Sequence, residues 1–129
     1  MKVRGTITVA ATVLALVGTA QGATLFTPAL NVPLGENSLE CHIVNVSTQD
    51  RTVTILALDF DGVALQTVGP FTVEPGRNRF VSAPATVIND VNNFPRYCKF
   101  IVEGGKTNYR ASACVFQSLV GCIATIPAD

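Results

Sequence analysis

The 129-residue sequence contains no tryptophan and one histidine, and only 14% of its residues are charged. Any Ser-His-Asp or Cys-His catalytic couple would have to use His42, the single histidine. Apolar residues do not recur at helical spacing over three turns, so no long amphipathic helix is predicted. Nine basic residues balance nine acidic ones, which leaves no surplus of positive charge. We therefore expect no nucleic-acid partner, because such a partner favours a basic face.

The first 22 residues have the pattern of an export signal. Lys2 and Arg4 precede an uncharged apolar run over Ile7–Val17, and Ala20-Gln21-Gly22 offers small residues at the cleavage spacing. We predict cleavage before Ala23 and a product in the periplasm or the extracellular medium of a bacterium. The run is shorter than the roughly 20 residues of a membrane-spanning helix, so we expect no stable membrane insertion after cleavage, although an uncleaved anchor is the alternative.

The remaining residues, 23–129, are expected to form a single small domain with a formal charge of −2, because the signal holds two of the nine basic residues and none of the acidic ones. This part contains all four cysteines: Cys41, Cys98, Cys114 and Cys122. An even number of cysteines in a small exported domain indicates two disulfides. Their spacings of 57, 16 and 8 lack the paired short intervals of a zinc site, so we expect neither a metal nor another cofactor.

Short runs rich in Val, Ile, Thr and Phe alternate with turn-forming Gly, Pro, Asn and Asp clusters, which predicts an all-β domain. The predicted strands are Leu25–Leu30, Leu39–Val46, Thr52–Phe60, Val63–Val68, Asn78–Ser82, Arg96–Glu103, Asn108–Phe116 and Leu119–Ile126, with a possible short strand at Phe71–Glu74. Seven or eight such strands in about 100 residues are typical of an antiparallel β-sandwich.

The sandwich is predicted to be immunoglobulin-like. Cys41 and Cys98 lie early in the second and sixth main strands, the positions that an inter-sheet disulfide joins in that fold. We favour Cys41–Cys98 with Cys114–Cys122. The two strands around Gly104-Gly105 are expected to form a hairpin. The main alternative pairing, Cys98–Cys114 with Cys41–Cys122, requires a register of this hairpin that places Cys98 opposite Cys114.

The stretch Ile55–Leu65, ILALDFDGVAL, resembles the first motif of the haloacid dehalogenase-like phosphatases. The resemblance implies that Asp59 is the nucleophile and that Asp61 transfers the proton and helps to hold magnesium. That family needs a parallel strand followed by a helix, whereas the chain continues after Gly62 as another apolar, β-branched run. We therefore predict a hairpin turn at Asp61-Gly62 and no phosphatase activity.

Three further features have simple structural interpretations. Asp59 and Asp61 do not fit an EF-hand loop, although they could contribute to a weak surface calcium site. His42 alternates with Cys41 and Ile43 and is expected to face solvent. Asn45-Val46-Ser47 matches the N-glycan acceptor sequence, but we expect Asn45 and Ser47 to bond the backbone of the following loop.

Loops provide the candidate ligand surfaces. The loops 47–51 and 104–107 are expected to lie together at one end and to present Gln49, Asp50, Arg51 and Lys106. At the other end the long segment 83–95 could bind a sugar or a protein through Asn89, Asp90, Asn92, Asn93 and Phe94. The alternative is a polar crossover held by Val87, Ile88 and Val91.

From these features we expect a non-enzymatic protein that acts through its surface in a binding, adhesive or envelope-structural role, with a protein or glycan as partner. One alternative is a carbohydrate-binding module with an exposed aromatic pair, for which Phe94, Tyr97 and Tyr109 are the candidates. Another is an assembly subunit that exchanges the strand Leu25–Leu30 between copies.

Overall fold

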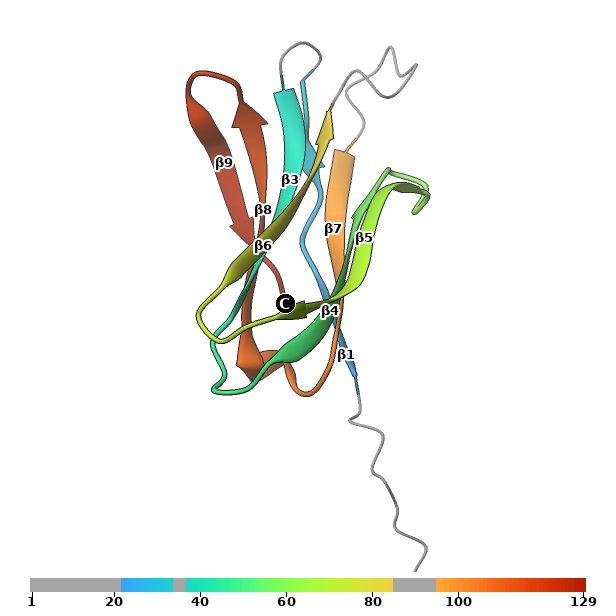
Figure 1. Cartoon of the computed structure of the whole chain (residues 1–129). Coiled ribbons are helices and arrows are strands. Elements are labelled where there is room, and N and C mark those ends of the chain that lie inside the picture. Colours follow the sequence, from blue (N-terminus) through green and yellow to red (C-terminus); the bar gives the residue numbers. More distant parts are fainter. Residues whose placement is uncertain (1–21, 34–36, 85–94) are drawn as a thin grey trace, which may run out of the picture.

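The computed structural model describes residues 22–33, 37–84 and 95–129. Strands dominate these ranges, in the order β1 (Ala23–Phe26), β2 (Leu30–Asn31), β3 (Asn37–Asn45), β4 (Arg51–Leu58), β5 (Ala64–Val73), β6 (Asn78–Pro84), β7 (Pro95–Val102), β8 (Tyr109–Gln117) and β9 (Gly121–Pro127), with the short 3-10 turn η2 (Lys106–Asn108) before β8. The strands form two layers that face each other (Figure 1).

The two layers are antiparallel sheets. One has the order β1-β7-β4-β5, with β2 also paired to β7, and the other has the order β6-β3-β8-β9. This architecture confirms the predicted all-β sandwich. The predicted strand Leu25–Leu30 is divided into β1 and β2, both of which pair with β7.

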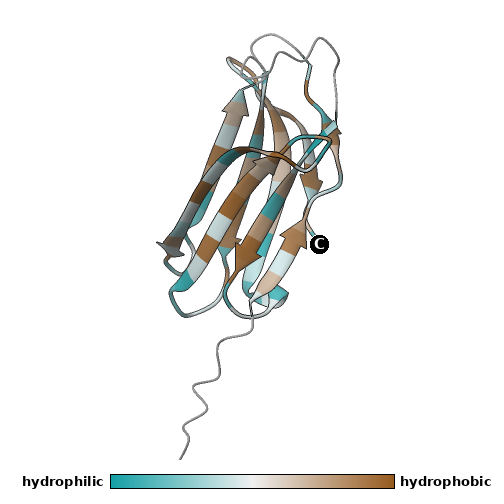
Figure 2. Cartoon of the chain, turned by 90° about the vertical axis from the view of Figure 1, so that its right-hand side faces the viewer, coloured by the Kyte–Doolittle hydropathy of each residue, from teal (hydrophilic) through white to brown (hydrophobic). Residues whose placement is uncertain are grey.

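The core lies between the sheets and follows from the alternation of residues along each strand. Leu39, Cys41 and Ile43 of β3 face Val53 and Ile55 of β4 across the sandwich, and all five are completely buried. Figure 2 shows the corresponding alternation of apolar and polar bands along the strands. Because successive side chains of a strand point to opposite faces, the residues between these positions form the outer surfaces.

Two disulfides connect the strands. Cys41–Cys98 links β3 to β7 and thus joins the two sheets, while Cys114–Cys122 links β8 to β9 within one sheet. Both have a Cα–Cα distance of 5.6 Å, and these are the pairs favoured from the sequence. Structural disulfides of this kind indicate an oxidising compartment outside the cytoplasm.

The placement of β8 differs from the sequence-based expectation. We predicted a hairpin of β7 and β8 around Gly104-Gly105, but the turn η2 carries the chain into the other sheet, where β8 pairs with β3 from Asn37↔Gln117 to Asn45↔Tyr109. The hairpin prediction was wrong because adjacent strands need not share a sheet. Cys98 and Cys114 consequently lie in different sheets, which removes the basis for the alternative pairing.

The strand order also limits the immunoglobulin-like comparison. In an antibody constant domain the last strand pairs with the sixth strand, in the sheet opposite the first strand. Here β1 pairs with β7, and β8 pairs with β3 in the opposite sheet. The sandwich and the inter-sheet disulfide agree with the prediction. Relative to the antibody domain, however, β1 and β8 have exchanged sheets.

β5 is one continuous strand, although the sequence predicted an interruption between Val68 and Phe71. Val53 pairs with Phe71 and Ile55 with Val68, so two residues of β5, Gly69 and Pro70, lie opposite one residue of β4. This is a β-bulge, and Gly69 enables it by adopting a φ of +109°. β5 is an edge strand, where a proline that lacks the N–H group is tolerated.

Candidate functional site

The Asp-Phe-Asp-Gly motif forms a hairpin loop between β4 and β5. The backbone N–H of Asp59 donates to the carbonyl of Val63 at 2.9 Å, and the N–H of Gly62 donates to the carbonyl of Asp59 at 3.0 Å. Gly62 has a φ of +79°, whereas Asp61 does not have a positive φ. The loop is therefore a three-residue turn over residues 60–62, one residue longer than the predicted Asp61-Gly62 turn, with glycine supplying the left-handed position.

The side chain of Asp59 has a structural role in this turn. Its Oδ1 accepts a hydrogen bond of 2.8 Å from the backbone N–H of Val63. The motif lies between two antiparallel strands, whereas the phosphatase motif requires a parallel strand and a crossover helix. Neither Asp59 nor Asp61 belongs to a cluster of three or more potential metal-binding side chains among the described residues.

The outer face of the sheet β6-β3-β8-β9 carries a cluster of polar and aromatic groups centred on His42. The Nε2 atom of His42 lies 2.8 Å from Oε2 of Glu40, two residues away on the same face of β3. The His42 ring also stacks on Phe80 of β6, with 5.3 Å between ring centroids. His42 points away from the core, as predicted, but these neighbours leave only 25% of its side chain exposed.

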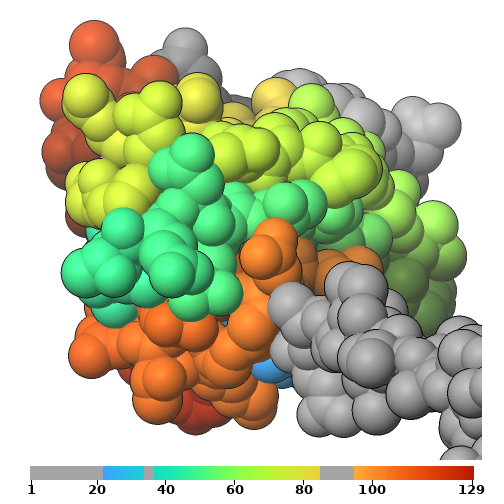
Figure 3. Space-filling view, turned by 60° about the horizontal axis from the view of Figure 1, so that its bottom comes forward, coloured from blue at the N-terminus to red at the C-terminus, as the bar shows by residue number. Residues whose placement is uncertain are grey.

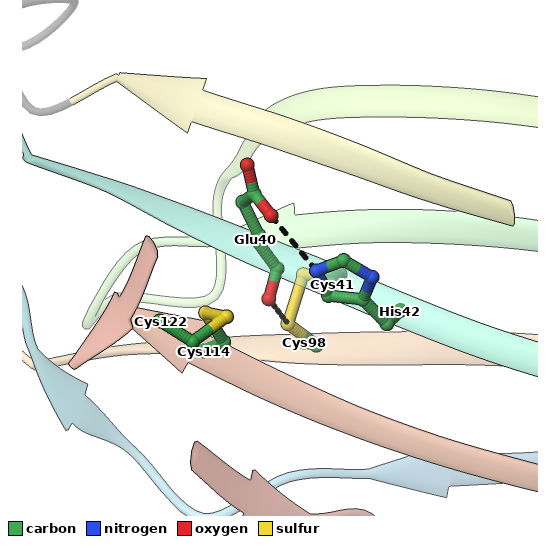
Figure 4. Close-up of polar contacts among 6 residues, drawn as sticks. All are labelled: Glu40, Cys41, His42, Cys98, Cys114 and Cys122. Atoms are coloured by element: carbon green, nitrogen blue, oxygen red, sulfur yellow. Dashed lines mark hydrogen bonds and ion pairs between the residues drawn. A yellow bond between two sulfur atoms is a disulfide. The ribbon is translucent and has the colours of Figure 1, made fainter. Parts of the chain in front are cut away.

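The Cys114–Cys122 disulfide lies next to this pair (Figure 4). Glu40 is directly opposite Cys114 in the β3–β8 ladder, and His42 is opposite Ser112. A shallow groove of about 430 Å³ runs beside the disulfide and His42 and is also lined by Val44, Asn78, Arg110, Ala111, Ser112, Thr125 and Pro127. One face of the sheet thus combines a carboxylate, an imidazole, a disulfide and an aromatic ring.

A second groove of about 430 Å³ lies between the edge strands β5 and β6. It is lined by Val68, Gly69, Pro70, Phe71, Arg79 and Phe80. The Arg79 guanidinium lies over the Phe71 ring at 5.9 Å from its centroid, a cation–π distance. Phe80 is 57% exposed and contributes to this groove while it stacks on His42.

Phe80 is not among the candidate residues predicted from the sequence. A signal was nevertheless present, because Val81 and Ala83 are the inward positions of β6 and Phe80 therefore occupies a position that faces solvent. A phenylalanine at an outward position of an alternating strand indicates an exposed ring.

The aromatic residues proposed for carbohydrate binding have different environments. Tyr109 is buried, and its hydroxyl donates a hydrogen bond to the Glu103 carbonyl, so it cannot stack on a sugar in this structure. Tyr97 forms a tilted pair with Phe26 on the outer face of the other sheet, with 6.4 Å between ring centroids. The Lys99 ammonium group lies 5.7 Å from the Phe26 ring centroid.

The remaining predicted ligand surface falls on residues whose structure is not described. Asn89, Asp90, Asn92, Asn93 and Phe94 lie in the range 85–94, outside the described residues.

The loops 47–51 and 104–107 lie side by side at one end of the sandwich (Figure 3). A Cβ atom added to Gly104 would approach Nη1 of Arg51 to 2.9 Å, which confirms this proximity. Gln49, Asp50 and Lys106 are exposed at this end, whereas Arg51 is partly buried and donates from Nε to the Ser47 hydroxyl at 3.3 Å. These residues are grouped as predicted, but the Arg51 side chain is hydrogen-bonded within its own loop.

The Asn45-Val46-Ser47 sequence has the structural role that we expected. Oδ1 of Asn45 accepts hydrogen bonds from the N–H and the hydroxyl of Ser47, at 2.9 and 2.7 Å. Asn45 is completely buried, so its side chain is inaccessible to a glycosylating enzyme in the folded protein.

Comparisons with known proteins inform the fold only. No family model and no curated protein matches the chain. The structure is similar to the protein described as "Crystal Structure of Thermotoga maritima 1070", with a TM-score of 0.52 and 11% sequence identity over 82% of this chain and 91% of that chain. At this identity the similarity concerns the arrangement of strands and does not extend to a function.

Within residues 22–33, 37–84 and 95–129, no helix has the length and apolar character needed to cross a membrane.

Proposed function

We propose that this chain is a small exported, non-enzymatic β-sandwich protein that binds a protein or glycan partner through its surface, with Phe80 at the centre of the contact. The observation that carries this proposal is the ring of Phe80, which is 57% exposed although it belongs to a regular strand. Because the backbone of β6 is paired to β3 from Asn78 to Pro84, the ring is presented in a fixed position. Aromatic side chains at rigid positions are typical anchors of binding surfaces.

The surroundings of Phe80 support a binding role. Its ring lines the groove that contains Val68, Pro70 and Phe71, and it stacks on His42, which lines the groove that contains Arg110 and Ser112. A partner that covered both would contact mainly apolar side chains, together with the hydrogen-bonding groups of Arg79, Arg110 and Ser112, and such a combination occurs at specific interfaces.

The environment of the candidate catalytic groups favours a non-enzymatic role. Asp59 accepts a hydrogen bond inside a hairpin, and the imidazole of His42 is engaged by Glu40 and Phe80. We expect the mature protein with magnesium to hydrolyse a generic phosphate ester no faster than the background rate. Reproducible turnover that is abolished by Asp59→Asn would contradict this part of the proposal.

The ligand surface can be tested with a matched pair of aromatic substitutions. Phe80→Ala removes the proposed anchor, whereas Phe60→Ala removes a ring of similar exposure, 63%, from the β4–β5 hairpin. The wild type and both variants are applied to a glycan array and to proteins of the native periplasm or culture medium, and retained ligands are quantified. We expect ligands that the wild type and Phe60→Ala retain to bind Phe80→Ala about tenfold more weakly or worse, since a hot-spot residue contributes about 2 kcal/mol or more. Equal retention by all three proteins would contradict the proposal.

A second candidate is carbohydrate binding by the Phe26–Tyr97 pair. Phe26 is 45% exposed and forms the aromatic pair on one sheet that such a module needs. If this pair is the site, Phe26→Ala abolishes binding to a glycan on the array while Phe80→Ala leaves it unchanged.

A further inference from the structure

Four potential metal ligands converge on the outer face of the sheet β6-β3-β8-β9. They are Glu40 and His42 of β3, Cys114 of β8 and Cys122 of β9, and one ligand atom of each lies within 4.8 Å of all the others (Figure 4). The sulfurs are joined in a disulfide, and a disulfide sulfur lacks the negative charge of the thiolate that binds metals. The group is therefore incomplete as a metal site only because of its oxidation state.

We propose that reduction of the Cys114–Cys122 disulfide creates a tetrahedral Zn²⁺ site formed by two thiolates, the His42 imidazole and the Glu40 carboxylate. Thiolate, imidazole and carboxylate are the three ligand types that zinc accepts in proteins, and four-coordination is its usual geometry in structural sites. The site adjoins the ligand surface around Phe80, because His42 stacks on Phe80 and lines one of the two grooves together with Cys114 and Cys122.

The dimensions of the cluster fit this ion. With Zn–S of about 2.3 Å and Zn–N and Zn–O of about 2.0–2.2 Å, the ligand atoms of a tetrahedral site are about 3.3–3.8 Å apart. The His42 Nε2 and Glu40 Oε2 atoms are 2.8 Å apart, and the largest separation within the cluster is below 4.8 Å. Zinc binding thus requires shifts of about 1 Å, which side-chain rotations can supply.

The backbone holds these ligands in place independently of the disulfide. Glu40 and His42 are two residues apart and share one face of β3, and Glu40 is directly opposite Cys114 in the β3–β8 ladder. Cys122 lies on β9, which is paired to β8 along its length. Breaking the sulfur–sulfur bond therefore leaves the four ligands on three hydrogen-bonded strands.

Glu40 provides a further indication. It is only 8% exposed although it lies on the outer face of the sheet, and His42 is its ion-pair partner. Glutamate is rarely buried to this extent unless it is paired or coordinates a metal.

The chemistry needs a dithiol reductant, such as a thiol–disulfide oxidoreductase or dithiothreitol. The reductant supplies two electrons and two protons, the Cys114–Cys122 bond breaks to give two thiols, and the reductant's own dithiol becomes a disulfide. Zn²⁺ then replaces the two thiol protons, which are released to solvent.

The difference in solvent exposure between the two disulfides determines which of them is reduced. Cys122 is exposed on the edge strand β9, whereas Cys41 and Cys98 are completely buried in the core. An attacking thiolate can therefore reach the sulfur of Cys122 in the folded protein, while the inter-sheet disulfide remains protected.

The test uses the mature chain, folded and treated with dithiothreitol under native conditions, with the new thiols identified by alkylation and peptide mapping. Zn²⁺ affinity is measured by competition with a chromophoric chelator after the reductant is removed without air, and Co²⁺ is added separately to detect thiolate-to-metal charge transfer. We expect alkylation at Cys114 and Cys122 only, one Zn²⁺ per reduced chain and none per oxidised chain. Alkylation at Cys41 and Cys98 instead, or no zinc binding by the reduced chain, would overturn the proposal.

Variants distinguish the four-ligand site from binding by two thiolates alone. His42→Ala and Glu40→Gln should each weaken Zn²⁺ binding about tenfold or more, because even outer-shell partners of metal ligands contribute that much. Ser112→Ala alters the residue opposite His42 in the β3–β8 ladder, which is not a proposed ligand, and should leave the affinity unchanged. Zinc binding that is equally strong in His42→Ala and the wild type would refute the proposed coordination.

Discussion

The side-chain amide of Asn45, on β3, donates a hydrogen bond of 2.8 Å to the carbonyl of Val73, on β5. These strands belong to different sheets, so this bond connects the two layers. The second amide hydrogen reaches the Gln49 carbonyl at 2.7 Å, so the same residue also fixes the loop that follows β3.

Replacing Asn45 should therefore destabilise the whole domain. Asn45→Ala leaves two carbonyl groups without these donors and creates a small cavity at a completely buried position. We expect a loss of about 2–4 kcal/mol in the free energy of unfolding, measured with urea. Asn78→Ala, at an exposed position of β6, serves as the control and should change stability by less than about 0.5 kcal/mol. Similar effects of the two substitutions would contradict the proposed role.

The two disulfides should contribute unequally to stability. Cys41–Cys98 spans 57 residues and Cys114–Cys122 spans 8. In the chain-entropy model the double substitution Cys41→Ala with Cys98→Ala costs about 4 kcal/mol, and the corresponding loss of Cys114–Cys122 costs about 2.5 kcal/mol. Chemical denaturation of both double variants tests the order. A larger loss for the Cys114–Cys122 variant would show that the short bridge, and not the inter-sheet bridge, dominates.

Gly69 should not tolerate a side chain. It has a φ of +109°, and a Cβ atom at this position would lie 2.7 Å from the Val53 carbonyl oxygen. Gly76 also has a positive φ, +72°, but a Cβ atom there would meet nothing within 4 Å. Gly76→Ala should cost about 1 kcal/mol for the backbone conformation alone, whereas Gly69→Ala should cost about 2–3 kcal/mol because the strand must also shift. Thermal unfolding of the two variants provides the comparison, and equal melting temperatures would show that the bulge adapts freely.

The hydroxyl of Tyr109 should make the stability of the folded protein decrease at alkaline pH. Burial raises the pKa of Tyr109 above its ordinary value of 10.0; the Glu103 carboxylate acts in the same direction, and the Arg51 guanidinium opposes it. Because the folded pKa is higher than the unfolded pKa, the neutral phenol stabilises the fold below pH 10, and this contribution is lost as the pH rises through the folded pKa.

The substitution Tyr109→Phe isolates this effect. It removes the hydrogen bond to the Glu103 carbonyl, and we expect a loss of about 1–2 kcal/mol at neutral pH. Urea unfolding at several pH values should show the difference between wild type and variant narrowing above pH 10. A difference that stays constant through this range would mean that Tyr109 titrates alike in the folded and unfolded states.

Export remains a prediction from the sequence alone. Mass spectrometry of the secreted protein should show a start within a few residues of Ala23, since the small residues Ala20 and Gly22 lie at the cleavage spacing. A membrane-bound product that retains Met1 would contradict it.

Several features could be predicted because they depend on local sequence. Cys41 and Ile43 alternate with His42 along one strand. This alternation alone determines that Cys41 and Ile43 face the core if His42 faces outward. The Gly62 turn follows from the need for a left-handed backbone position, and the spacing of the cysteines favoured the pairs that form.

The tertiary structure alone decided the partner of β8 and which outward side chains meet. The local sequence does not determine whether β8 pairs with β7 or with β3. The choice depends on how both sheets bury their apolar faces against each other. The burial of Tyr109 follows from that choice, and so does the convergence of Glu40, His42, Cys114 and Cys122 from three strands. The alternation of residues determined which side chains point outward, but only the pairing of β3 with β6 and β8 placed them beside one another.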